Sequence, residues 1–232
     1  MHTHIYALAV LITTSASAQT IINAKASGSG HITAEWDGAN PSFIEASSSA
    51  INFIGSVNGT APGDSRQAFL AFDLPTLTSA PTSAIISFNM RNADAVSSAP
   101  WFNVDAYGFT TSPSIADTYI GSDDSSKTKL YDNLLTPATQ NNETISFEIA
   151  PYLQTLYSAG TPTVTTVYIR LNPDDPDGDL GTDGDDYGRY RPLLFNGLGE
   201  GIATLSIVPE PSSYAALLSA IALSLATIYR RK

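Results

Sequence analysis

The chain has 232 residues, and its 22 Asp and Glu outnumber its 11 Lys and Arg, which gives a net charge of −11 at pH 7. This balance opposes nucleic acid binding, because a phosphate backbone requires a basic protein face. The chain has no cysteine, so disulfides and thiolate metal sites are excluded. The composition suits a protein outside the cell that holds divalent cations, and its stability must come from a large apolar core.

Residues 1–18 have the layout of a secretory signal peptide. A short start from Met1 to His4 precedes an apolar run from Ile5 to Ile12, and Ala16-Ser17-Ala18 supplies the small residues of a cleavage site. We predict cleavage before Gln19, and an apolar first strand is the alternative. Residues 19–207 then form the folded body, whose length suits one domain.

In this body, short runs with strand chemistry are separated by Gly, Pro, Ser, Asn and Asp. The spacing is typical of antiparallel sheets packed on each other, so we predict an all-β, jelly-roll-like β-sandwich with one short helix. The predicted strands are Thr20 to Ala26, His31 to Trp36, Ala50 to Gly55, Ala68 to Asp73, Ala84 to Met90, Phe102 to Tyr107, Thr144 to Ile149, Thr165 to Leu171, Leu193 to Asn196 and Ile202 to Val208.

The helix is predicted in the segment PYLQTLYSAG. Pro151 suits a first helical turn, Leu153, Leu156 and Tyr157 share a face, and Gly160 can adopt the left-handed conformation that ends a helix.

The segment FNVDAYGF alternates apolar with more polar side chains, which predicts that one face of its sheet is wet. The residues expected on that wet face are Asn103, Asp105 and Tyr107.

The order of these segments resembles that of DNRLRE-type domains, which are jelly-roll modules related to carbohydrate-binding modules and found on bacterial surface proteins. The resemblance is carried by RQAFLAFDLPTL, SAIISFNM, FNVDAYGF, ISFEIAPYLQTLYSAG, TTVYIRLN and RPLLF, in that order. It implies an inner strand with Arg66 and Phe72-Asp73-Leu74, a crossover at the Pro151 helix, and Arg191-Pro192-Leu193 near the last strands.

The segment NPDDPDGDLGTDGDDYG, the aspartate-rich loop, crowds many carboxylates among glycines. A hard cation would stabilise them, and oxygens at alternate residues suit Ca²⁺. The spacing departs from a calcium loop at Leu180, which stands where the sharp turn requires glycine. A solvated acidic loop is therefore the alternative to a calcium site. The ligands that the spacing predicts are Asp175, Asp177, Asp179 and Asp183.

Several aromatic residues stand beside Gly, Asp, Pro or Arg, as rings at loop tips that stack on sugars do. The candidates for sugar stacking are Trp36, Trp101 and Tyr107. Half-buried rings that cap the core of a sandwich are the alternative, because Trp and Tyr commonly pack in that way.

Catalysis by the body is not predicted. His31 is the one histidine left after export, and the chain has no Gly-x-Ser-x-Gly elbow. Glycoside cleavage needs two acids that face each other, and candidates such as Glu143, Glu148 and Asp105 are not paired by any sequence pattern.

The carboxyl end has three consecutive parts. Pro209-Glu210-Pro211 favours an extended backbone, because each proline lacks an N–H and biases its predecessor away from the helical region. Residues 214–229 carry no charge and predict a short membrane-spanning helix, with an amphipathic core helix as the alternative. The basic end Arg230, Arg231 and Lys232 then stays in the cytoplasm.

Together with an export signal, these parts resemble the PEP-CTERM sorting signal of Gram-negative bacteria that make exopolysaccharide. The resemblance covers residues 208–232. It implies recognition by exosortase, a membrane-embedded cysteine protease-like enzyme, and removal of the tail near the motif. We therefore predict a single-pass membrane precursor that is exported across the inner membrane and processed to a protein of the cell surface or the extracellular matrix.

Three roles stay open for the mature body. The first is a non-catalytic structural or adhesive component of the exopolysaccharide or biofilm layer. The second is a carbohydrate-binding module for that polysaccharide, and the third is a small polysaccharide hydrolase or lyase.

Overall fold

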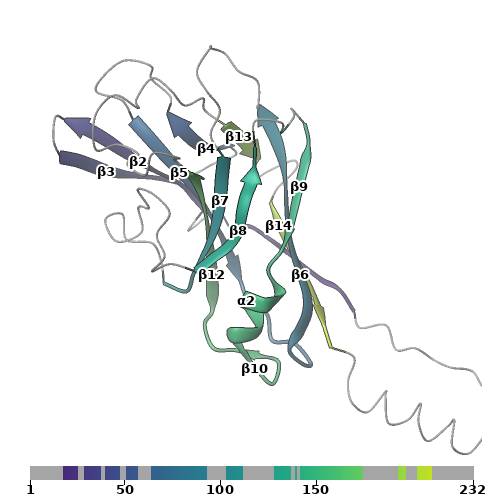
Figure 1. Ribbon diagram of the computed structural model, residues 1–232. Helices are drawn as coiled ribbons and strands as arrows, with labels where there is room; N and C mark the ends of the chain where they lie inside the picture. Colours follow the sequence, from purple (N-terminus) through teal and green to yellow (C-terminus); the bar gives the residue numbers. More distant parts are fainter. Residues whose placement is uncertain are drawn as a thin grey trace, which may run out of the picture.

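The computed structural model describes residues 18–25, 29–37, 40–47, 51–56, 64–92, 103–111, 128–136, 139, 142–174, 193–196 and 203–210. These residues form antiparallel β-sheets with one short helix, so the described part of the chain is all-β (Figure 1). Residues 1–17 of the predicted signal peptide, the aspartate-rich loop from Asp175 onward and residues 211–232 lie outside the described residues, while Asn172, Pro173 and Asp174 at the start of that loop belong to the last strand of the 142–174 segment.

The strands before the helix cover most of the described chain. They are β1 (Thr20–Asn23), β2 (Gly30–Asp37), β3 (Asn40–Ser47), β4 (Ile51–Ser56), β5 (Asp64–Asp73), β6 (Pro81–Asn92), β7 (Asn103–Phe109), β8 (Thr128–Leu135) and β9 (Thr144–Glu148). The helix α2 (Ala150–Thr155) is followed by β10 (Tyr157–Ser158), β11 (Thr161–Pro162), β12 (Thr166–Asp174), β13 (Leu193–Asn196) and β14 (Thr204–Pro209).

The strands pair in two groups. The first group has the order β1-β14-β6-β9, and the second has β5 paired with β2, β4 and β12, followed by β7 and β8. β3 pairs with β2 of the second group. β13 pairs with β6 of the first group and with β4 of the second, and so connects the two groups. α2 connects β9 of the first group to the segment that leads into β12 of the second (Figure 1).

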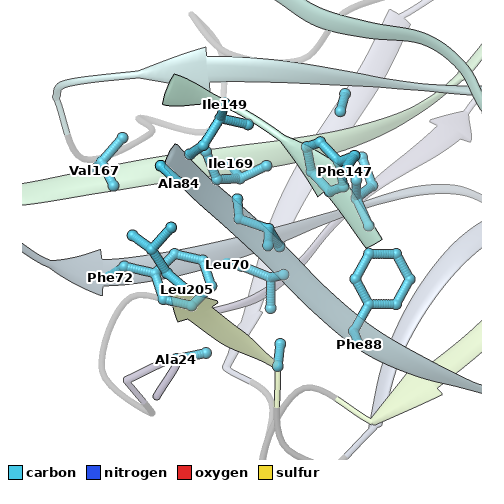
Figure 2. Close-up of a cluster of buried hydrophobic side chains, with 14 of the residues drawn as sticks. Ala24, Leu70, Phe72, Ala84, Phe88, Phe147, Ile149, Val167, Ile169 and Leu205 are labelled. Atoms are coloured by element: carbon cyan, nitrogen blue, oxygen red, sulfur yellow. The ribbon is translucent and has the colours of Figure 1, made fainter. Parts of the chain in front are cut away.

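Side chains from both groups meet in one apolar core (Figure 2). The alternating burial of β14 and β9 follows from strand geometry, since successive side chains point to opposite faces. Strands of both groups, and the helix, contribute fully or almost fully buried residues. Among these are Leu70, Phe72, Ile86, Phe88, Phe147, Leu153, Val167, Ile169, Leu205 and Ile207.

The segment predicted as a helix is confirmed at its start and corrected at its end. Pro151 lies in the first turn, but the helix ends at Thr155. Gly160 does have a positive φ of 87°, yet it stands with Ala159, whose φ is 48°, in the two-residue turn between β10 and β11. Two positive φ angles match the twist of a tight hairpin, which explains why a glycine here does not cap the helix.

The predicted wet face of β7 is wrong. β7 is buried on both faces, and Asp105 and Tyr107 are each 1% exposed. The reason is that β7 lies between β12 and β8, and the neighbouring side chains on the same face, Arg170 and Asn172, are also only 1% exposed. This part of the second group therefore carries polar groups in its interior.

Candidate functional site: a hydroxyl-rich sheet face and the start of the tail

The outward side of the β1-β14-β6-β9 group is a broad face of small polar side chains, which we call the hydroxyl face. Antiparallel pairing places its members in rows across the strands, and one such row runs Asn23, Thr204, Ser87 and Ser146. The hydroxyl face comprises Ile21, Asn23, Ile85, Ser87, Asn89, Thr144, Ser146, Thr204 and Ser206.

Hydrogen bonds between strands fix these side chains. The Ser87 and Ser146 hydroxyls lie 2.8 Å apart, and the Thr144 hydroxyl donates to Asn89 Oδ1 over 2.8 Å. Such cross-strand pairs stabilise a sheet and hold its side chains in a fixed geometry. The face therefore offers ordered donors and acceptors rather than freely rotating groups.

Glu148 is an exposed acidic residue on the same face, as the register partner of Ile85, and its carboxylate is engaged in the fold. Oε1 accepts the backbone N–H groups of Ala84 over 2.6 Å and of Ala150 over 2.8 Å, and Oε2 accepts the Ser83 hydroxyl over 2.9 Å. The carboxylate thus joins β9 to β6 and to the first residue of α2. Glu148 is therefore the one charged residue in the paired rows of this face, and both of its carboxylate oxygens accept hydrogen bonds from the fold.

Two exposed isoleucines stand within the polar rows. Ile21 is 65% exposed and Ile85 is 37% exposed, and both are register partners of Ser206. Hydroxyl and amide groups beside exposed apolar methyls can bind a neutral partner that carries both hydroxyls and C–H surface. This chemistry suits an uncharged polymer better than a charged one.

A second polar cluster lies inside the other group of strands. Arg170 Nη1 donates to Gln67 Oε1 over 3.0 Å, and Asp105 Oδ2 lies 2.7 Å from Lys129 Nζ. Asp105 Oδ1 also accepts the backbone N–H of Asn133 over 2.7 Å, at a point where β8 departs from regular register. Buried polar groups require such partners, so these contacts stabilise the pairing of β5, β12, β7 and β8.

Tyr107 belongs to this interior cluster rather than to a loop tip. It is 1% exposed, and Lys129 Nζ lies 5.9 Å from the centre of its ring. The ring is therefore closed to a sugar at the surface, and the packing alternative holds for this residue. Trp36 lies on β2, and its side chain is not described, while Trp101 lies outside the described residues.

The predicted calcium ligands, Asp175, Asp177, Asp179 and Asp183, also lie outside the described residues. In the part of the chain that the structure describes, no group of three or more acidic or histidine residues is arranged to hold a metal ion.

The start of the predicted sorting motif is attached directly to the body. Pro209 is the last residue of β14, is buried, and pairs with Pro81 after a shift in register. The Glu210 N–H donates to the Ala80 carbonyl oxygen over 2.9 Å, and the Ser79 hydroxyl donates to the Glu210 carbonyl oxygen over 2.7 Å. The Glu210 residue itself is exposed.

The sequence contained a signal for the hydroxyl face that the motif search did not use. TISFE and TLSIV each place a Thr and a Ser two positions apart, on either side of an apolar residue that turns out to be buried. The contact of Ser79 with Glu210 had no such signal, because the two residues are far apart in sequence.

No helix among the described residues is long and apolar enough to cross a membrane, and the predicted span at 214–229 lies beyond them. A scan against protein-family models and a search of curated proteins found no match.

Proposed function

We propose that this chain is an exported, non-catalytic protein of the cell surface or extracellular matrix, sorted by exosortase through the PEP-CTERM-like tail. Its body is then a jelly-roll-like β-sandwich with a structural or adhesive role in the exopolysaccharide layer. The tail inserts in the inner membrane as a precursor and is removed near Pro209-Glu210-Pro211.

The placement of Glu210 carries this proposal. Glu210 follows the buried Pro209 at the end of a core strand, and its exposed side chain is the first part of the motif that an enzyme could meet. A sorting enzyme that reads this carboxylate would approach a rigid surface rather than a loose linker. That geometry favours recognition, because less conformational entropy is lost on binding.

Replacing the glutamate tests the sorting proposal. We expect Glu210→Ala to leave an uncut, membrane-held precursor, with mature protein reduced at least about tenfold, the loss that follows from about 1.4 kcal/mol of recognition energy. Glu143→Ala is the matched control, since Glu143 is also an exposed glutamate but lies next to β9. Mature protein of normal size and location in Glu210→Ala would contradict the proposal.

The hydroxyl face favours a second candidate function, which is binding of the neutral exopolysaccharide. We expect retention on that polysaccharide to fall about tenfold in Ser146→Arg, because a long charged side chain would cover the face. Ser158→Arg is the control, since Ser158 is an exposed serine on β10. Equal retention of both variants would exclude the face, and loss of retention only in Trp101→Ala would move the site to that residue.

A further inference from the structure

We infer that Ser79 and Ala80 form a clamp that holds Glu210 on the body, so that the backbone before the tail is protected from a processing enzyme. We call these two residues the clamp. The contact itself is independent of the sorting proposal, but its consequence for processing rests on that proposal.

The clamp engages both backbone hydrogen-bonding groups of Glu210. The Glu210 N–H donates to the Ala80 carbonyl oxygen, and the Glu210 carbonyl oxygen accepts the Ser79 hydroxyl. The preceding residue, Pro209, has no N–H to offer and is buried. One residue earlier, the Val208 carbonyl accepts the Thr82 hydroxyl over 3.1 Å. The chain is thus held on successive residues as it leaves the sheet.

Hydrogen bonds from α2 and from the β10–β11 hairpin hold the segment that carries the clamp. The N–H of Leu77 donates to the Gly160 carbonyl over 2.8 Å, and the Tyr157 hydroxyl donates to the Pro75 carbonyl over 2.9 Å. The Gln154 side-chain amide donates to the Pro81 carbonyl over 2.9 Å. Residues 75–81 are therefore fixed at both ends, which makes the clamp a rigid part of the fold rather than a mobile loop.

An enzyme that cuts an extended segment commonly binds it through backbone hydrogen bonds. The groups it would need at Glu210 are already occupied, whereas the Glu210 side chain stays exposed. The peptide bonds on the amino side of Glu210 are therefore closed to cleavage while the body is folded. Hydrolysis adds one water across the bond that breaks, so the mature body should keep Glu210 and end with a new carboxylate at or after it.

Hydrogen exchange on the purified full chain in detergent tests the clamp. Because proline has no N–H, Glu210 carries the only amide between Val208 and Ser212. We expect its exchange to be at least about tenfold slower than in the unfolded chain. Ser79→Ala should accelerate it about fivefold, the effect of one lost hydrogen bond, and Ser79→Thr should restore it. Ser87→Ala, which removes a half-buried hydroxyl that bonds Ser146 on the first group of strands and makes no contact with Glu210 in the described structure, should leave it unchanged.

Exchange of the Glu210 amide at the unfolded rate in the unmodified chain would overturn the clamp, as would an equal rate in Ser79→Ala and Ser87→Ala. Mass analysis of the mature protein tests the consequence, and a polypeptide that ends before Glu210 would refute the protection. A chain that is never cut would refute the proposed sorting, while the exchange rates would still decide the clamp.

Discussion

Gly160→Ala is the substitution whose effect follows most directly from the geometry of the body. A Cβ at this position would overlap the Leu77 carbonyl oxygen and would lie 2.9 Å from the Ser79 backbone nitrogen. The φ of 87° is also one that alanine adopts only with strain. The left-handed conformation costs about 1–2 kcal/mol for an L-residue. Displacing backbone to make room costs about 1–3 kcal/mol more, so we expect a total loss of about 2–5 kcal/mol.

For a domain of this size, that loss corresponds to a melting temperature about 5–15 °C lower, which circular dichroism of the purified protein would measure. Ala159→Gly is the control in the same turn, because it relieves a positive φ while adding backbone entropy to the unfolded chain, and we expect little net change. Since the overlap moves residues beside the clamp, Gly160→Ala should also speed exchange at Glu210. An unchanged melting temperature would refute the packing of the hairpin on residues 77–79.

Three further predictions concern the core, alkaline stability and calcium. Phe72→Ala removes a fully buried ring and should cost about 3–5 kcal/mol in a urea titration. Burial raises the pKa of Tyr157 from 10.0 to about 12, so the unfolded state loses its proton first and stability falls as pH rises between those values. Between about pH 9 and 11.5, the free energy of unfolding should therefore fall by about 2 kcal/mol less in Tyr157→Phe than in the unmodified protein. Urea titrations that give the same fall for both proteins would contradict this. If the aspartate-rich loop binds calcium, about 1 mM Ca²⁺ should raise the melting temperature of the protein. At a hundredfold excess of Ca²⁺ over the dissociation constant, the free energy of unfolding would increase by about 3 kcal/mol. An identical melting curve with and without Ca²⁺ would count against the site.

The strand pattern was predictable wherever one face of a strand is apolar. In β9 and β14 a strict alternation places the apolar residues in the core, and the predicted boundaries agree with the observed strands to within a few residues. β3 and β8 were not predicted. β3 begins with Asn40 and Pro41, which read as a turn, and β8 contains Asn133 with a positive φ of 54° where its pairing with β7 is irregular.

The interior polar cluster could not be predicted because its partners come from distant strands. Arg170 and Gln67 are separated by 103 positions, and Asp105 is satisfied by residues of β8 that local sequence does not connect to it. Alternation in β7 correctly separated the two faces, but it gave no information on whether the polar face meets water or other polar side chains. Pairing across the sheet decides that question.

Antiparallel pairing of β1 with β14 brings the two predicted processing points to the same end of the body. Thr20 is the register partner of Ile207, and the Gln19 side-chain amide donates to the Ser206 hydroxyl. If the signal peptide and the tail are processed as proposed, the two cut ends of the body would therefore lie side by side. Because β14 also lies against β6, the clamp on Glu210 can form only after distant segments have paired. If the tail is removed as proposed, folding would fix both ends first, and the body, rather than the tail alone, would determine which bond the processing enzyme can reach.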